Sequence, residues 1–197
     1  IYNPVAGGGR AGREWPSAEA ALRRHFSDLT VRATRGPGDA VALAGEAARD
    51  GTDIVVVLGG DGTMSEVVDG LLKAAQDGGK LPRLGIVPDG TGSDLARGMG
   101  VRKIDDALAM LRARTISKVD IGRVTLTLPH GGTQVRYFLN IADFGIGGAV
   151  AERVNGNPKR FGPFLTFLYA VLRTLLTFKN PLVSIQIDGE LFETRTI

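Results

Sequence analysis

The clearest signal of the fold is the sequence Ile54-Val55-Val56-Val57-Leu58-Gly59-Gly60-Asp61-Gly62-Thr63-Met64-Ser65-Glu66. Its first five residues are apolar and mostly β-branched without alternation, which is typical of a parallel strand buried on both faces. Thr63 and Glu66 predict a capping box at the start of a helix. The glycines between strand and helix allow a sharp turn and bring backbone N–H groups and the helix dipole to a bound anion. The stretch therefore predicts a phosphate site that contains one carboxylate, Asp61.

The composition excludes several kinds of chemistry. The 197 residues, 43% of them hydrophobic, fit one large domain or two small ones. The absence of Cys excludes disulfides, thiolate catalysis and zinc–thiolate sites. The only two His, His25 and His130, lie far apart in the sequence, so we expect neither a His-based triad nor a polyhistidine metal site. A net charge of +3 favours anionic ligands without indicating nucleic acid, and we predict no nucleic-acid partner.

Both ends of the chain lie in strand-like runs. The sequence starts at Ile1-Tyr2-Asn3-Pro4 without an initiator Met and stops at Thr194-Arg195-Thr196-Ile197, so we expect a truncated first strand and a partly missing second domain. No signal peptide or lipidation motif is visible. The longest apolar stretch, Phe164–Phe178, contains Arg173 and is too short to span a bilayer.

Strands and helices alternate over the first 115 residues. After the truncated strand, the expected helices are Glu14–His25, Asp39–Arg49, one that runs to about Ala75, and Ile104–Arg114; the expected strands are Leu29–Thr34, Ile54–Leu58 and Leu84–Pro88. This alternation predicts right-handed crossovers and an α/β fold with a doubly wound parallel sheet. The loops at Asn3, Thr34, Gly59 and Asp89 would then meet at the carboxyl edge, where such sheets bind ligands.

The pattern changes from Ser117 onward. Residues 119–128 and 135–141 predict one β-hairpin, and Leu182–Ile187 with Leu191–Ile197 predict another across Asp188-Gly189. A helix is expected between them over Phe164–Phe178, with a thin polar stripe formed by Thr166, Arg173, Thr174 and Thr177. We therefore predict an α/β nucleotide domain at 1–115 and part of a β-rich second domain at 116–197.

Three carboxylates, Asp61, Asp94 and Asp120, together with the Gly-rich loops favour phosphoryl transfer with Mg²⁺, since hard oxygen ligands hold that ion. Each feature also has a structural alternative: a plain turn at Gly59–Thr63, a first-turn helix residue at Asp94, and a solvated strand residue at Asp120. Arg10 and Arg13, beside a Gly-rich loop, suit phosphate neutralisation, with plain surface charges as the alternative. The chain has neither a Walker-type loop nor a His-Arg-Asp kinase loop.

Five ordered motifs carry a family resemblance. They are Asn3-Pro4-x-x-Gly7, Thr34 with Gly38-Asp39-Ala40, Gly59-Gly60-Asp61-Gly62-Thr63, Pro88-x-Gly90-Thr91-Gly92-x-Asp94-Leu95-Ala96-Arg97, and Val119-Asp120. Together they resemble the diacylglycerol kinase catalytic-domain family, and most of all the bacterial soluble lipid kinases related to sphingosine kinases. The resemblance covers essentially the whole chain. It implies an α/β ATP-binding domain, a β-rich lipid-binding domain, ATP as phosphate donor and a lipid hydroxyl as acceptor.

The resemblance also implies roles for individual residues. Asp61 would be the catalytic residue, and Asp61, Asp94 and Asp120 would organise Mg²⁺ directly or through waters. The implied ATP-binding residues are Asn3, Pro4, Gly7, Gly9, Arg10, Thr34, Gly59, Gly60, Gly62, Thr63, Glu66, Gly90, Thr91 and Gly92. Ser93 stands where the family more often has Asn, and we expect its polar side chain to cap a helix. The implied location is cytoplasmic, peripheral to the inner face of the membrane.

The family places its general base in an Asp-Gly-Glu segment near the C-terminus. Asp188-Gly189-Glu190 has these letters, but it lies in an early hairpin, so we expect a turn there and the true segment beyond Ile197. The segment Arg153–Ile187 contains five cations and no acid beside several Phe, which suits an anionic membrane surface, with the apolar helix lining an acyl-chain cleft. The alternative is a core helix beneath the second domain's sheet.

Two rival functions remain open. NAD kinases share the Gly-Gly-Asp-Gly-Thr loop, but the later segment Gly90-Thr91-Gly92-Ser93-Asp94-Leu95-Ala96-Arg97 stands where that family would carry an Asn-x-Gly segment. The other rival is a nucleotide- or lipid-binding module without catalysis.

Overall fold

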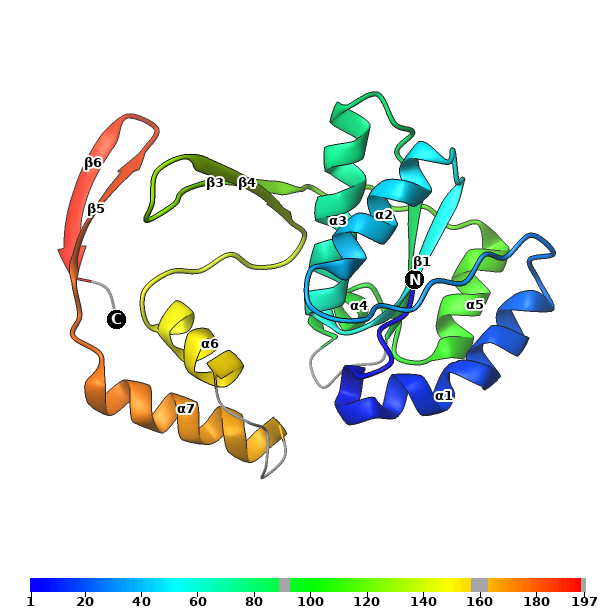
Figure 1. The fold of residues 1–197 in the computed structure, drawn as a ribbon, viewed down its shortest axis with the longest axis horizontal. Helices are drawn as coiled ribbons and strands as arrows, with labels where there is room; N and C mark the ends of the chain where they lie inside the picture. Colours follow the sequence, from blue (N-terminus) through cyan, green and yellow to red (C-terminus); the bar gives the residue numbers. More distant parts are fainter. Residues whose placement is uncertain (89–92, 157–162, 196–197) are drawn as a thin grey trace. The chain divides into compact units, whose positions relative to one another are not determined.

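The computed structural model describes residues 1–88, 93–156 and 163–195 (Figure 1). Within these ranges the contacts divide the chain into two compact units, Ile1–Ile141 and Ala142–Ile197. The elements of the first unit are α1 (Ala6–Arg23), α2 (Asp39–Arg49), β1 (Ile54–Gly59), α3 (Asp61–Gln76), β2 (Arg83–Pro88), α4 (Asp94–Gly98), α5 (Ile104–Ala113), β3 (Gly122–Thr127) and β4 (Thr133–Phe138). Those of the second are α6 (Ile146–Gly156), α7 (Pro163–Thr177), β5 (Leu182–Ile187) and β6 (Glu190–Arg195).

The central sheet of the first unit is parallel. β1 pairs with β2 from Ile54 opposite Arg83 to Gly59 opposite Pro88. Tyr2 forms parallel bridges to Leu58 on one side and to Ala33 on the other, so the N-terminal residues lie between β1 and the segment around Ala33. The strand predicted over Leu29–Thr34 is thus reduced to a single bridge, and the predicted parallel order is confirmed.

Helices cover both faces of this sheet, which confirms the doubly wound α/β class. Val55 and Val57 of β1 pack with apolar residues of α2 and α3. Val56 and Leu58 pack on the opposite side, in a cluster that includes residues of α1 and α5. The β-branched run of β1 is therefore buried because it has a hydrophobic neighbour on each face.

Glycine allows α2 and α3 to approach each other closely. A Cβ placed on Gly70 of α3 would lie 2.2 Å from the backbone oxygen of Val41 in α2. Only a residue without a side chain fits at this crossing. The packing of α3 depends on it, and α3 carries Asp61 at its first position.

The antiparallel hairpins also form as predicted. β3 pairs with β4 and β5 pairs with β6, the latter through Asp188 and Gly189, which both have positive φ. This is the turn expected at Asp188-Gly189-Glu190. β4 packs against α3, so the β3–β4 hairpin groups with the first unit; the domain division expected near residue 115 stays a prediction.

The second unit contains a helix that we did not predict. α6 forms at Ile146–Gly156 in spite of Gly147 and Gly148. It packs against α7, whose position confirms the predicted helix.

On α7, Thr166, Ala170 and Thr174 are buried, whereas the large side chains of Phe167, Leu172, Leu175 and Leu176 are exposed. No helix of the described residues has both the length and the apolar character needed to cross a membrane.

Candidate functional site

Asp61 lies at the carboxyl edge of the parallel sheet. β1 ends at Gly59, Gly60 is extended at the N-cap of α3, and Asp61 is the first helical residue. A Cβ on Gly59 would lie 3.0 Å from Thr63, so this glycine lets the helix begin directly against the end of the strand. The local sequence thereby holds one carboxylate where parallel α/β sheets bind their ligands.

The two carboxylate oxygens of Asp61 have different surroundings. Oδ2 accepts a 3.2 Å hydrogen bond from the backbone N–H of Asp94. Oδ1 is buried and has no hydrogen-bond partner among the described residues. A buried anionic oxygen without a partner is unfavourable by about 1–3 kcal/mol or more, so Oδ1 is suited to receive a cation or a donor from a ligand.

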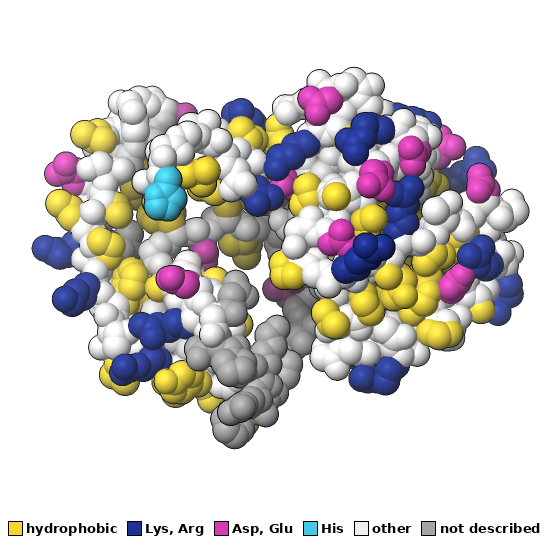
Figure 2. Space-filling view, viewed as in Figure 1, with side chains coloured by type: hydrophobic (Ala, Val, Ile, Leu, Met, Phe, Trp, Pro, Cys, Tyr) yellow, Lys and Arg dark blue, Asp and Glu magenta, His cyan; other side chains and the backbone are white. Residues whose placement is uncertain are grey.

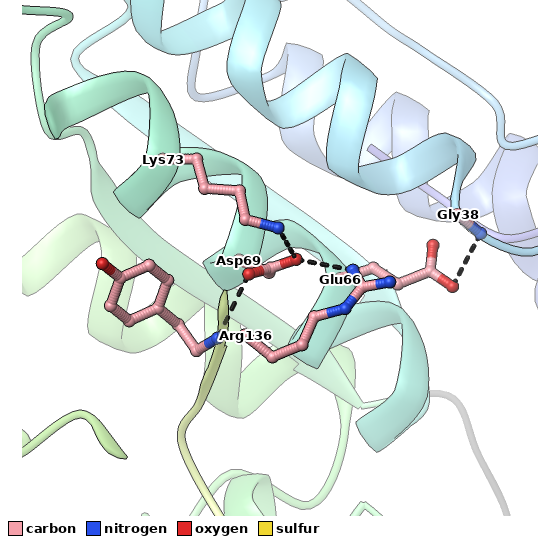
Figure 3. Close-up of polar contacts among 6 residues, drawn as sticks. Gly38, Glu66, Asp69, Lys73 and Arg136 are labelled. Atoms are coloured by element: carbon pink, nitrogen blue, oxygen red, sulfur yellow. Dashed lines mark hydrogen bonds and ion pairs between the residues drawn. The ribbon is translucent and has the colours of Figure 1, made fainter. Parts of the chain in front are cut away.

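The first two turns of α3 hold three other loops. Asp61 binds the loop before α4 through Asp94, and Thr63 Oγ1 accepts a 3.0 Å hydrogen bond from Asn3 Nδ2. Glu66 Oε1 accepts a 2.9 Å hydrogen bond from the backbone N–H of Gly38, before α2 (Figure 3). These contacts bring together the loops that the sequence places at one edge of the sheet.

This arrangement corrects the capping-box prediction. Thr63 and Glu66 do not cap α3; the N-cap is Gly60, and no side-chain hydrogen bond is made there. Both side chains instead bind residues distant in the sequence, Asn3 and Gly38. The capping-box motif predicts that Thr63 and Glu66 bind backbone groups of their own helix. Their actual partners come from loops that pack against α3.

Hydrogen bonds within the N-terminal segment stabilise the turn at Asn3 and Pro4. Asn3 Oδ1 accepts a 3.1 Å hydrogen bond from the Val5 N–H, and Pro4 O accepts one of 3.1 Å from the Gly12 N–H. The following residues Gly7, Gly8 and Gly9 all have positive φ, which fits Gly at each of them. Among the predicted ATP-binding residues, Asn3 and Pro4 lie directly before α1, and Gly7 and Gly9 lie in the non-helical stretch near its start. All four belong to one segment, which is bonded to Thr63 through Asn3.

Two other predicted nucleotide residues lie near this loop in the fold. Thr34 is buried, and its N–H donates a 2.9 Å hydrogen bond to Tyr2 O, next to Asn3. Arg10 is half-exposed on α1, with its Nε 3.8 Å from a carboxylate oxygen of Glu14. Gly90, Thr91 and Gly92 lie outside the described residues.

The predicted magnesium ligands do not form one cluster. The side chain of Asp94 is exposed and pairs with Arg97, and Asp120 is exposed ahead of β3. Over residues 1–88, 93–156 and 163–195, no three His or acidic side chains lie close enough together to hold a metal. The organisation of Mg²⁺ by Asp61, Asp94 and Asp120, directly or through waters, therefore stays a prediction, and the partnerless Oδ1 of Asp61 fits a cation.

Ser93 precedes α4 with a left-handed backbone, φ +50°. Its hydroxyl is buried and has no partner in the described part of the chain, and it makes no capping hydrogen bond, contrary to our expectation. The backbone oxygen of Ser93 accepts from the Arg97 N–H instead.

A cavity of about 290 Å³ opens beside Asp61. One wall is the start of α3, with Asp61, Gly62, Met64 and Ser65, and Leu95 of α4 lies next to it. The other wall is the end of β4 and the residues after it, Phe138–Ile141. We did not predict residues 138–141 as part of the site, because no local signal says that this hairpin packs against α3.

Asp69, also in α3, is a buried carboxylate, 2% exposed. Burial alone raises its pKa, but hydrogen bonds from Lys73, Arg136 and the Tyr137 N–H, with the charge of Lys73, outweigh burial and hold the pKa below its usual value. Asp69 is therefore an anion at neutral pH. No local pattern in the sequence distinguishes Asp69 from the other acidic residues.

The fold and the loops at its carboxyl edge define the class of doubly wound α/β domains that bind ligands where their strands end. The chain belongs to the diacylglycerol kinase catalytic-domain family, because the family model for the diacylglycerol kinase catalytic domain matches residues 1–124.

Similar proteins agree with this assignment. The chain is 30% identical to a diacylglycerol kinase of Staphylococcus aureus strain MRSA252, and to that of strain bovine RF122 / ET3-1, over 98% of this chain and 58% of each relative. A solved structure of a diacylglycerol kinase from Bacillus anthracis str. Sterne is 27% identical, with a TM-score of 0.65 over 98% of this chain and 59% of that one. The chain thus spans less than two thirds of the length of these relatives.

Proposed function

We propose that this chain contains the ATP-binding part of a lipid kinase that transfers the γ-phosphate of ATP to a hydroxyl of a diacylglycerol-like lipid. Family membership and the names of the relatives support this reaction. The observation that carries it is the carboxylate of Asp61, which binds the loop before α4 and keeps one oxygen without a partner among the described residues.

In the proposed reaction the lipid hydroxyl oxygen forms a bond to the γ-phosphorus. The bond from that phosphorus to the oxygen bridging the β- and γ-phosphates breaks, ADP leaves, and the hydroxyl proton passes to a base. Asp61 accepts a hydrogen bond from the Asp94 N–H and is the first residue of α3. We propose that it holds a cation at the phosphates and that another group takes the hydroxyl proton. Mg²⁺, when bound, would neutralise charge on the phosphates.

Phosphate binding would fall to backbone groups around Asp61. Gly59, Gly60 and Gly62 surround the start of α3, where N–H groups and the helix dipole favour an anion. The segment Asn3–Gly9, at the start of α1, is bonded to α3 through Thr63, so this segment and the Gly59–Gly62 turn would both contact one ATP molecule.

The proposed site of action is the inner, cytoplasmic face of an anionic membrane. The exposed large apolar side chains of α7, such as Phe167, Leu172 and Leu176, support contact with lipid, with Arg173 on the same helix as a partner for anionic headgroups. On the face of the first unit seen in Figure 2, Lys and Arg are interspersed with Asp and Glu, so this face has no uniform basic surface for nucleic acid.

The test is transfer of labelled phosphate from ATP by the complete chain. Diacylglycerol, phosphatidylglycerol, sphingosine and ceramide in mixed micelles, and NAD in solution, would serve as acceptors. Transfer to a lipid supports the proposal. Transfer to NAD alone would make the protein an NAD kinase-like enzyme, and ATP binding in a calorimeter without transfer would make it a binding module; either result contradicts the proposal.

A further inference from the structure

Asp69 joins the helix of the candidate site to the hairpin beside it. Its Oδ2 accepts hydrogen bonds of 2.8 Å from both Lys73 Nζ and an Arg136 Nη, and its Oδ1 accepts one of 3.1 Å from the Tyr137 N–H (Figure 3). Lys73 belongs to the same helix as Asp69, whereas Arg136 and Tyr137 belong to β4. Two of the three hydrogen bonds therefore cross from α3 to β4.

These bonds fix the edge of β4. Tyr137 lies opposite Arg123 of β3, and its N–H is bonded to Asp69, so the carboxylate binds this strand where a further strand would otherwise pair. The Tyr137 hydroxyl also contacts Gln76 Nε2, at the last residue of α3. A buried carboxylate is stable only with such partners, which makes the α3–β4 contact specific rather than a general apolar packing.

The residues directly after this contact form a wall of the cavity beside Asp61. Phe138, Leu139, Asn140 and Ile141 line it, opposite the first turn of α3. The ring of Phe138 lies over Gly122, where a Cβ would be only 2.1 Å from its Cζ. The wall is thus held from two sides, by Gly122 of β3 and by Asp69 of α3.

We propose that Asp69 is a positioning residue that sets the distance between the two walls of the cavity and so determines how the acceptor lipid is bound. This inference rests on the proposed lipid kinase function. Asp61 and Asp69 lie two turns apart on one helix, so a shift of β4 at Asp69 moves residues 138–141 relative to Asp61. The loops expected to bind ATP are held by Asn3, Thr63 and Glu66 and do not depend on this contact.

The two cations on Asp69 allow a matched test. Arg136→Met removes the side-chain bond of the two that cross to β4, and Lys73→Met removes a bond of the same length within α3. Both side chains are partly exposed, so neither change buries a new group. Each variant of the complete chain would be assayed for KM of lipid in mixed micelles, KM of ATP and kcat, and its hydrogen exchange over residues 134–141 would be measured.

We expect Arg136→Met to raise the KM for lipid at least fivefold and to speed exchange over residues 134–141, with the KM for ATP within twofold of wild type. Lys73→Met should leave all of these values within twofold. Equal effects of the two variants, or a parallel rise in both KM values, would overturn the inference, since Asp69 would then act on stability alone. If the wild-type protein phosphorylates no lipid, the proposed function is wrong, but the positioning role is still tested. Faster hydrogen exchange over residues 134–141 in Arg136→Met than in Lys73→Met would support that role, and equal exchange would contradict it.

Discussion

The backbone N–H of Asp94 donates a hydrogen bond to Oδ2 of Asp61, across 33 residues of sequence. Asp61 and Asp94, both predicted to organise Mg²⁺, are thus joined by a hydrogen bond between the carboxylate of Asp61 and the main chain of Asp94. Asp94 is consequently placed by Asp61, while its own side chain turns to Arg97. This relationship gives Asp61 a structural role in the site besides the chemical role that we propose for it.

Asp61→Asn should abolish lipid phosphorylation while the fold persists. The amide keeps an oxygen for the Asp94 N–H but loses the negative charge at the partnerless Oδ1. We expect kcat to fall about 100-fold or more, the scale of losing one preorganised electrostatic contact. Asp77→Asn, just after the other end of α3, is the control. Near-normal turnover of Asp61→Asn with intact circular dichroism would contradict the assignment.

Thr63→Val should weaken ATP binding. The change keeps the shape of the side chain but removes the acceptor of the 3.0 Å bond from Asn3, which frees the Asn3 loop from α3 at a cost of about 1 kcal/mol. We expect a several-fold rise in the Kd for ATP by calorimetry. Thr63→Ser keeps the hydroxyl and should bind as wild type does; an equal loss in both variants would show that the hydrogen bond is not the cause.

Gly70→Ala should destabilise the first unit by about 1–3 kcal/mol, because a methyl group at this position would lie 2.2 Å from the Val41 oxygen and push α2 away from α3. Urea unfolding followed by circular dichroism measures it. Gly62→Ala, in the same helix with open space around its Cβ, is the stability control and should not lower the midpoint. Similar midpoints for the two variants would argue against close α2–α3 packing.

Asp69→Asn should remove a pH-dependent part of the stability. The pKa of Asp69 is lowered in the folded protein, so its stabilisation is complete above the unfolded value of about 3.9 and is lost as the pH falls through the folded value. At pH 7 we expect the variant to be less stable by about 2 kcal/mol. The gap from wild type should narrow below about pH 4 in urea titrations.

The control for this pH dependence is Asp53→Asn. Asp53 also has a lowered pKa, chiefly through its hydrogen bond with Lys80, but it is exposed and its ion pair is screened by water. Its effect at pH 7 should be much smaller. A gap for Asp69→Asn that does not change between pH 7 and pH 3 would mean that its charge is not what stabilises the α3–β4 contact.

A double change, Leu172→Gln with Leu176→Gln, should reduce binding to anionic vesicles. Both side chains are more than half exposed, so their replacement should leave the melting temperature unchanged and remove apolar area available to lipid. Co-sedimentation with phosphatidylglycerol vesicles measures binding. Leu126→Gln, an exposed leucine of β3, is the control, and undiminished binding of the double variant would exclude α7 as the contact.

The elements that were predicted correctly are those whose conformation is determined by residues adjacent in the sequence. The β-branched run of β1, the alternation of strands and helices, and the Asp188-Gly189 turn all follow from local periodicity and turn chemistry. The same local reasoning missed α6, because Gly147 and Gly148 are poor helix formers. It also predicted that the first helix starts at Glu14, whereas α1 starts at Ala6.

The α/β class and the place of Asp61 between β1 and α3 could be predicted from the sequence because they depend on residues close together in the chain, and the family could be recognised because its ordered motifs are each short. The contacts of the polar side chains, in contrast, become visible only in the folded chain: Thr63 binds Asn3, Glu66 binds Gly38, and Asp69 binds β4. Those partners lie 28 to 68 residues apart, and no local pattern encodes them, since they arise only when separate loops pack at one edge of the sheet.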